Sequence, residues 1–357
     1  MNQKALLFIF LSIIAVSIIS CEKEKTSPTN PGFATGVFVW CEGAFNANNG
    51  SISWYNPDSA MTVNNLFQTV NGRPAGDVIQ SFALAGDYGV IVANNSGKIE
   101  IVNLESFESE STITGFSYPR HFAYSGNGSG YLSNGSMQGQ VYRIDIKEGK
   151  VTDSIEVGMG PEQLLISGNY LYVANSGGWA ADNTVSVIDR GTDEVIKTIV
   201  VGDIPIAMVS DINGNIWVLC RGKVVYNETW TEIVEETDSR LVRISPLSLE
   251  ADREIILGKK GDYFNPSYLA ISPSGEDLYF GEYEGLFSMG IEENVQPSGP
   301  VTSEQFSAVG IQPETGLVFA LEITDYTTPG KLHIYDSDND FLTYETGIAP
   351  KGIVFAD

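Results

Sequence analysis

The sequence predicts an all-β protein, a seven-bladed β-propeller with four-stranded blades. The first observation is composition: the 357 residues include 37 Gly, 15 Pro, 16 Tyr and 17 Phe, and only 18% are charged. This mixture is typical of a folded, turn-rich and strand-rich chain. The second is a repeat of about 40 to 45 residues, which is the period of a four-stranded blade. The third is that the two ends of the repeat array complete each other.

The repeating unit is clearest in the middle of the chain. Residues 172–175, 183–189 and 195–202 form three segments of alternating apolar and polar residues, separated by Asn, Gly and Asp. Such alternation indicates strands, and the residues between them indicate turns. The first two strands of this unit recur at residues 90–94 with 97–103, 130–134 with 140–145, 216–220 with 240–245, and 317–321 with 330–336.

A further short strand precedes each unit and follows a proline or its equivalent. We predict these innermost strands at 78–84 after Pro74, 121–125 after Pro119, 163–167 after Pro161, 207–211 after Pro205, 268–272 after Pro266, 308–312 after Phe306 and 352–356 after Pro350. The spacing is even except between Pro205 and Pro266, where the sequence has a long insertion.

The last innermost strand has no blade after it, whereas the first unit begins at its second strand. We therefore expect residues 352–356 to supply the inner strand, and residues 36–70 the outer three strands, of one closing blade. Such closure removes open sheet edges. The alternative fold, an array of β-sandwiches, explains neither the even spacing nor the complementary ends.

The first residues have the pattern of a secretory signal. Lys4 precedes an apolar stretch at 5–19, which is too short for a comfortable membrane span and ends just before Cys21. The segment 18–21 resembles a lipobox, which implies cleavage after residue 20 and lipidation of Cys21. The alternative is an uncleaved anchor helix. We expect a signal peptide at 1–20, a flexible tether at 21–32 and a single propeller domain at 33–357.

Charge and cysteine content exclude several classes of function. Lys plus Arg number 20 and Asp plus Glu 45, so the formal charge is −25, which disfavours nucleic acid as a partner. Two His and three Cys provide no multi-histidine metal set and no disulfide framework. Cys41 and Cys220 fall in predicted blades too far apart for a disulfide, so we expect two free, buried thiols.

The residues of the repeat carry a family resemblance. Residues 172–205 resemble the forty-residue repeat of the YncE-like (YVTN repeat) surface-layer propellers. Residues 37–103, with Glu42-Gly43-Ala44-Phe45 and Gly76-Asp77-Val78-Ile79, are similar to the BtuG-type lipoprotein propellers of Bacteroidota. The second resemblance implies a lipid-anchored protein on the outer membrane, facing the exterior. It also implies capture of a cobalamin-like corrinoid, as ligand and not as catalytic cofactor, for a TonB-dependent transporter.

Candidate ligand-binding residues lie where propeller loops converge on the axis. Each of the four longest predicted loops carries at least one large aromatic residue. These residues could bind a planar ligand or pack over neighbouring blades: Phe45, Trp179, Tyr226, Trp230 and Tyr326. The starts of the inner strands add a polar and aromatic collar: Arg73, Tyr118, Arg120, His121, Gln163 and Tyr268.

Three kinds of function remain open. The sequence favours small-molecule binding, then a protein-interaction or adhesion scaffold, then a propeller lyase or hydrolase. For the last, His121 is the candidate base, although a hydrogen-bonded structural role is favoured for it, and no GxSxG or HExxH motif occurs. We therefore expect no enzyme and no catalytic residue. The acidic loop at 221–239 is either a solvated arm or a Ca²⁺ site, although its spacing matches no EF-hand loop.

Overall fold

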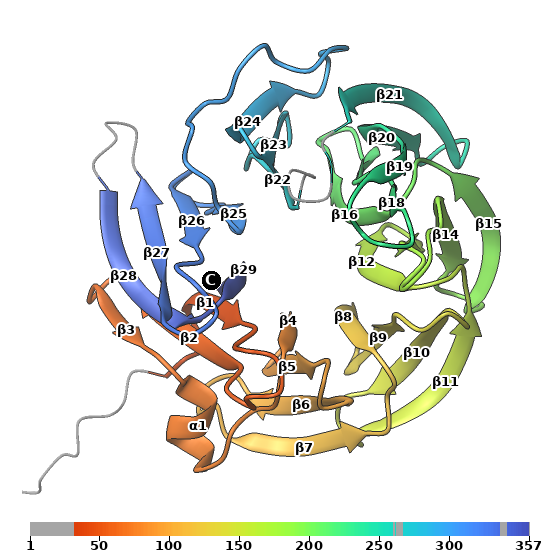
Figure 1. Cartoon of the computed structure of the whole chain (residues 1–357). Helices are drawn as coiled ribbons and strands as arrows, with labels where there is room; N and C mark the ends of the chain where they lie inside the picture. Colours follow the sequence, from red (N-terminus) through yellow and green to blue (C-terminus); the bar gives the residue numbers. More distant parts are fainter. Residues whose placement is uncertain (1–31, 260, 262–266, 336–340, 357) are drawn as a thin grey trace, which may run out of the picture. The chain divides into compact units, whose positions relative to one another are not determined.

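The computed structural model describes residues 32–259, 261, 267–335 and 341–356. Its compact unit, Gly32–Asp357, is a ring of seven blades around a central axis (Figure 1). Six four-stranded sheets and one three-stranded sheet form the blades, and a two-stranded hairpin is inserted in the fifth. The predicted seven-bladed, all-β fold is confirmed.

In blades two to seven the strands pair antiparallel in chain order from the axis outward. The bounds for blades two to four are β4 (Ile79–Ala85), β5 (Tyr88–Ala93), β6 (Lys98–Asn103), β7 (Ser109–Thr114); β8 (Pro119–Gly126), β9 (Ser129–Asn134), β10 (Gln140–Asp145), β11 (Lys150–Glu156); β12 (Pro161–Ser167), β13 (Tyr170–Asn175), β14 (Thr184–Asp189) and β15 (Glu194–Val200). These innermost strands begin within two residues of the predicted positions.

Blades five to seven depart more from the regular unit. Their bounds are β16 (Pro205–Ser210), β17 (Ile216–Cys220), β20 (Ser239–Ser245), β21 (Glu250–Gly258); β22 (Leu269–Ile271), β23 (Asp277–Glu282), β24 (Gly285–Gly290); β25 (Ala308–Ile311), β26 (Val318–Glu322), β27 (Pro329–Tyr335) and β28 (Phe341–Ile348). Blade six has three strands in the described part of the chain, and a single bridge from Leu286 to Thr302 follows its edge. The fifth blade contains the inserted hairpin β18 (Val224–Tyr226) and β19 (Ile233–Glu236).

The first blade joins the two ends of the propeller, as predicted. It consists of β29 (Pro350–Ala356), β1 (Gly36–Cys41), β2 (Ser51–Asn56) and β3 (Met61–Val63), in that order from the axis. β29 pairs antiparallel with β1 from Gly36–Ala356 to Cys41–Pro350. Closure therefore rests on a sheet between strands more than 300 residues apart in the chain.

The three outer strands of this blade lie within residues 36–70, as predicted, but the blade also contains a helix that was not predicted. The outermost strand has only three residues, and α1 (Leu66–Asn71) follows it. Leu66 and Phe67 are both buried, and Gly72 ends the helix in the left-handed conformation at φ 68°. Both side chains pack in the hydrophobic cluster between blades one and two.

Seven hydrophobic clusters of described residues fill the seven interfaces between neighbouring blades. β17 shows how one strand serves two of them. Its residues Ile216 and Val218 pack toward blade four, whereas Trp217 and Leu219 pack toward blade six. Because both sides of the strand are covered, its sequence is continuously apolar. Each such buried side chain contributes about 1.5–3 kcal/mol by removal of apolar area from water.

Both described cysteines are free and buried, as predicted. Burial raises the pKa of the Cys41 thiol to about 11, and burial likewise raises the pKa of Cys220. These thiols are therefore unreactive parts of the core. Cys21, the signal peptide at 1–20 and most of the tether lie outside the described residues. No helix of the described residues is long and apolar enough to cross a membrane.

Candidate functional site

We call one side of the ring the loop face. It carries the segments that join the second and third strands of each blade, at 42–50, 94–97, 135–139, 176–183, 221–238, 283–284 and 323–328. The innermost strands also begin on this side, because adjacent strands are antiparallel. The opposite face carries the turns between the third and fourth strands and those between the first and second.

A repeated backbone contact fixes the loop face. In five blades, the N–H that follows the second strand donates to the carbonyl that precedes the innermost strand, at 2.7–3.0 Å. The pairs are Glu42 to Ala349, Asn94 to Val78, Gly135 to Tyr118, Ser176 to Gly160, and Arg221 to Ile204. The acceptor residue has a positive φ of 53–57° in four of these pairs, all except Tyr118. Each loop is thus tied at its base to the start of an inner strand.

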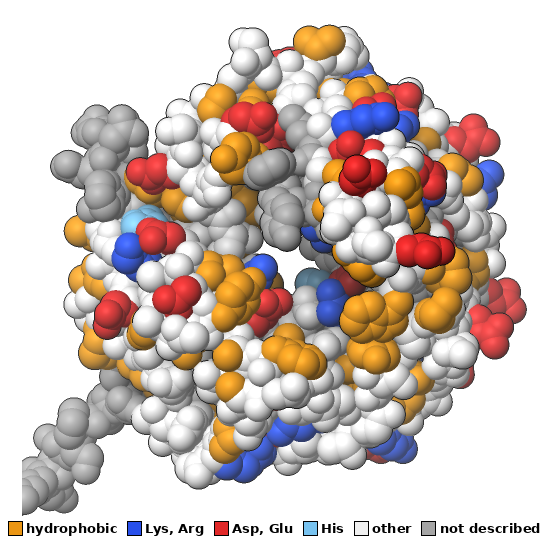
Figure 2. All heavy atoms as spheres, in the orientation of Figure 1, with side chains coloured by type: hydrophobic (Ala, Val, Ile, Leu, Met, Phe, Trp, Pro, Cys, Tyr) orange, Lys and Arg blue, Asp and Glu red, His pale blue; other side chains and the backbone are white. Residues whose placement is uncertain are grey.

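Exposed aromatic side chains gather on the loop face. Among the described residues, every strongly exposed Phe, Tyr or Trp lies in a segment of this face: Phe45 (71% exposed), Tyr118 (42%), Trp179 (82%), Trp230 (78%), Tyr283 (53%) and Tyr326 (51%). Figure 2 shows this face, with hydrophobic side chains around a central hollow and both charged types at its rim. The folded chain therefore presents six large rings in one direction.

Two pairs of rings on this face are already in contact. Tyr118 and Trp179, from blades three and four, meet edge to face with centroids 6.3 Å apart. Tyr226 and Trp230 stack at 5.7 Å on the inserted hairpin, where Tyr226 is half-buried. Contacts of this kind hold aromatic surface in place before a ligand arrives, which reduces the entropy lost on binding.

The inner strands of three consecutive blades form a polar collar. Arg120 on β8 donates to Gln80 of β4 at 2.7 Å and to both carboxylate oxygens of Glu162 on β12 at 2.8 Å. The three residues occupy equivalent positions, each the second residue of its inner strand. The collar is thus a preformed network with both donors and acceptors.

His121 follows Arg120 and is neutral at neutral pH. Burial lowers its pKa to about 4, and the Arg120 charge acts in the same direction, whereas Glu162 opposes it. Its ring has no hydrogen-bond partner among the described residues. A neutral imidazole at this place can contact a ligand.

Three residues that were predicted for the collar lie elsewhere in the structure. Arg73 lies away from the inner strands and pairs with the buried Glu100 at 2.7 Å, over the ring of Phe67. Gln163 accepts a hydrogen bond from the backbone N–H of Met208, which ties blade four to blade five. Tyr268 is 8% exposed and packs in the interface between blades six and seven. Side chains along an inner strand point alternately toward the axis and toward a blade interface. A collar assigned only by closeness to the prolines in the sequence therefore includes residues of both orientations.

Asp77 positions the loop that carries Phe45. Its two carboxylate oxygens accept the backbone N–H groups of Asn46 and Asn48 at 2.9 and 3.2 Å. Both asparagines have positive φ, 63° and 52°, so the loop needs such anchoring.

The acidic segment 221–239 is a hairpin arm. Glu235 pairs with Lys223 at 2.5 Å, and Glu236 accepts the N–H of Gly261 at 2.6 Å. No group of three or more His, Cys, Asp or Glu in the described residues is arranged to hold a metal ion. These two carboxylates of the arm therefore make internal contacts.

With this geometry in hand, comparison with known proteins identifies the family. The family described as "Domain of unknown function (DUF5074)" matches residues 35–292, well over half of the chain. The chain belongs to the DUF5074 family. No curated protein sequence matches it.

Solved structures agree with this DUF5074 member in fold. A quinoprotein alcohol dehydrogenase-like protein from Bacteroides thetaiotaomicron is 13% identical with a TM-score of 0.67, over 92% of this chain and 80% of that one. The β-propeller domain of Cps50 (Swd1) from Myceliophthora thermophila is 13% identical with a TM-score of 0.59, over 81% and 95%. At such identities the likeness shows the fold alone.

The DUF5074 propeller also has site residues that sequence reasoning missed. Tyr283 lies in the shortest loop of the face, where loop length gives no reason to expect a binding residue. Gln80 and Glu162 were missed because their place in the collar depends on which residues of an inner strand face the axis. His333 on β27, the second histidine of the chain, bonds Glu322 at 2.9 Å and Thr343 at 3.1 Å.

Proposed function

We propose that this protein binds a bulky, partly planar small molecule on its loop face. The proposal rests on the six exposed aromatic side chains on one face of the propeller. They come from segments spread over residues 45–326. Exposed aromatic area is costly to leave in water, and it is favourable when a ligand covers it. Below these rings, the collar of Gln80, Arg120 and Glu162 offers both donors and acceptors to orient the ligand.

A cobalamin-like corrinoid is the first ligand to test. The choice comes from the resemblance of residues 37–103 to BtuG-type propellers. A macrocycle with peripheral amides matches aromatic surface around a polar collar, since rings contact its faces and polar groups its amides. In this proposal the protein passes its ligand to a TonB-dependent outer-membrane transporter.

Anchoring to the outer membrane, with the propeller facing the exterior, is part of the same proposal and rests on Cys21. Labelling of cells with a radioactive fatty acid tests it. Label in the wild-type protein that disappears in Cys21→Ala supports the anchor, and equal label in both proteins contradicts it.

The binding proposal is tested first by a thermal-shift screen with cobalamin, hemin, ferrichrome and glycans. A ligand at about 100 times its Kd stabilises the folded state by about 2.7 kcal/mol, which is a visible shift. Titration calorimetry of the ligand found then compares Trp179→Ala and Tyr226→Ala with the wild type. Each should weaken binding by about tenfold or more, because both rings lie on the loop face.

Leu247→Ala is the control for the opposite face. Leu247 is 96% exposed in a turn between β20 and β21, so its loss disturbs no packing. Asp193, on the same face, is unsuitable because it accepts hydrogen bonds from Tyr131 and Arg143. If both aromatic variants bind as tightly as Leu247→Ala, the ligand is not held on the loop face.

A protein-binding scaffold is the second candidate, and the inserted hairpin favours it. Ile233 and Val234 on β19 are 43% and 62% exposed beside Trp230, which extends apolar surface onto the projecting arm. A small ligand on the axis does not need this arm, whereas a protein partner would bury it. A screen without any thermal shift, together with a partner whose binding requires residues 224–236, would favour this function.

A further inference from the structure

A cavity of about 280 Å³ lies between blades six and seven, away from the collar at the axis. The chain segment 302–306 runs from the edge of blade six, where Thr302 bridges Leu286, to the start of β25. The cavity lies between this segment and strands β26 and β27 of blade seven. Its lining residues are Glu304, Gln305, Phe306, Glu322, His333 and Tyr335.

Three aromatic rings in mutual contact line this cavity. His333 and Tyr335 are two residues apart on β27, so their side chains lie on the same side of the strand. Their ring centroids are 6.3 Å apart, and the ring of Phe306 lies 6.3 Å from His333 and 6.1 Å from Tyr335. Both nitrogens of His333 are hydrogen-bonded, to Thr343 and Glu322, so this residue offers its ring surface to a ligand.

Two carboxylates lie beside the rings. Glu322, whose side chain is 35% exposed, accepts from Lys331 at 3.0 Å, and this hydrogen bond lowers the pKa of Glu322, as does the contact with His333. Glu304 accepts the hydroxyl of Tyr335 through Oε2 at 2.6 Å, whereas its Oε1 has no hydrogen-bond partner among the described residues. No Lys or Arg lines the cavity, so its lining carries negative charge without a cation of its own.

The walls are held in place by contacts among themselves. Gln305 donates from Nε2 to the backbone carbonyl of Tyr283 at 2.7 Å, which ties segment 302–306 to blade six. The Tyr335–Glu304 hydrogen bond ties the same segment to blade seven. Such preorganisation reduces the ordering that binding requires.

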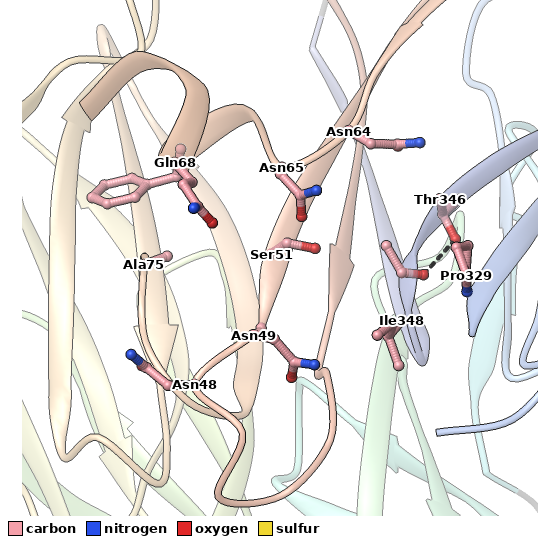
Figure 3. A pocket seen from close by; sticks show the side chains of 13 residues that line it. Asn48, Asn49, Ser51, Asn64, Asn65, Gln68, Ala75, Pro329, Thr346 and Ile348 are labelled. Carbon is pink, nitrogen blue, oxygen red and sulfur yellow. Dashed lines mark hydrogen bonds between the residues drawn. The ribbon is translucent and has the colours of Figure 1, made fainter. Parts of the chain in front are cut away.

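The charge of this lining distinguishes it from the cavity shown in Figure 3. That cavity, of about 350 Å³ beside α1, has thirteen lining residues, none of them charged. Nothing in its lining selects a ligand by charge. Between blades six and seven, by contrast, carboxylates and ring faces favour the same kind of ligand, because both attract positive charge.

We propose that the cavity between blades six and seven binds a small quaternary ammonium ion of the choline class. The methyl groups of such a cation contact the faces of Phe306, His333 and Tyr335, and the carboxylates balance its charge. A metal ion is disfavoured, since no group of three or more His, Cys, Asp or Glu in the described part of the chain is arranged to hold one. The volume is below that of most drug-sized sites, which suits a ligand of this size.

Saturation-transfer NMR of the full chain with choline tests the proposal, and its carbon isostere 3,3-dimethylbutan-1-ol isolates the effect of charge. Choline should bind with a Kd below about 5 mM, and the neutral isostere at least about tenfold more weakly. Glu304→Gln should weaken choline binding by about fivefold or more, because it removes a charge but keeps an acceptor for Tyr335. Phe306→Leu should have a similar effect, because it removes a ring but keeps apolar volume.

Glu314→Gln is the matched control for charge. Glu314 is exposed in the turn between β25 and β26, on the opposite face of the same blade, so this variant removes one negative charge outside the cavity. It should bind choline as the wild type does. Glu304 is exposed, so Glu304→Gln should also melt with the wild type and thus decides the question even if Phe306→Leu is unstable. Choline binding by Glu304→Gln equal to that of Glu314→Gln, equal binding of choline and its isostere, or no choline bound below about 50 mM would overturn the proposal.

Discussion

His121 illustrates how a single residue is governed by its surroundings. Its pKa is lowered to about 4 from an ordinary value of about 6.5, first by burial and then by the Arg120 charge. The folded protein therefore keeps this imidazole neutral at a pH where the unfolded chain protonates it. A neutral ring beside the Arg120–Glu162 ion pair adds no further charge to the collar.

We predict that His121 makes the fold less stable as the pH falls from about 6.5 to about 4. Within this window the unfolded state binds a proton at residue 121 that the folded state does not, so protonation favours unfolding. Urea unfolding at about pH 7.5 and about pH 4.5 measures the loss, which should be smaller in His121→Gln because glutamine does not titrate. An equal loss in both proteins would contradict the assigned pKa.

At the scale of the element, the junction before each inner strand determines where the loops lie. Gly160 occupies this position in blade four with φ 57°, and a Cβ there would lie 1.9 Å from the backbone nitrogen of Gly178. The loop that carries Trp179 can therefore approach only because residue 160 has no side chain.

Gly160→Ala should displace the loop at 176–183 and destabilise the fold by more than Gly168→Ala. Gly168 has the same φ of 57°, but a Cβ there would have no neighbour within 4 Å. Gly168→Ala therefore measures only the free-energy cost of alanine in the left-handed conformation, about 1–2 kcal/mol. Urea unfolding of both variants compares the two costs. Ligand binding should also be weaker in Gly160→Ala alone, and identical behaviour of the variants would show that the close approach is unimportant.

Elements were predicted best where sequence and packing agree. The blade strands repeat because each must alternate its side chains between two interfaces, and this need is visible as periodicity in the sequence. α1 escaped prediction because the burial of Leu66 and Phe67 depends on the neighbouring blade. Arg73 was misplaced for the same reason, since Glu100 comes near it only after folding.

For the whole molecule, the β1–β29 pairing is the contact that closes the ring. Deletion of Lys351–Asp357 should lower the melting temperature of the entire domain, because it exposes the inner edge of β1 and the side of two interface clusters. Differential scanning calorimetry of the full and truncated proteins measures this. Gly352→Ala provides a gentler variant, since its Cβ would lie 1.8 Å from the ring of Trp40. Unchanged melting of the truncated protein would mean that closure contributes no stability.

Ring closure was predictable as a whole, because complementary ends of a repeat array are a feature of sequence alone. The loop face was predictable in part. Phe45, Trp179, Trp230 and Tyr326 are exposed there as expected, since loop aromatics without a repeat partner have no core position. Of the collar, Arg120 was predicted, whereas Gln80 and Glu162 were missed, because the three residues converge only through the curvature of the sheet ring.

The shared first blade also determines how the chain can fold. β29 is the last strand in chain order, whereas its partner β1 is the first, so the intervening blades must be arranged before the two can meet. Contacts between such distant segments carry a large loop-closure entropy and slow the final step of folding. Until that step, the inner edge of β1 is an unpaired strand that can pair with another chain. The most aggregation-prone period of this protein is therefore the interval between synthesis of β1 and arrival of β29.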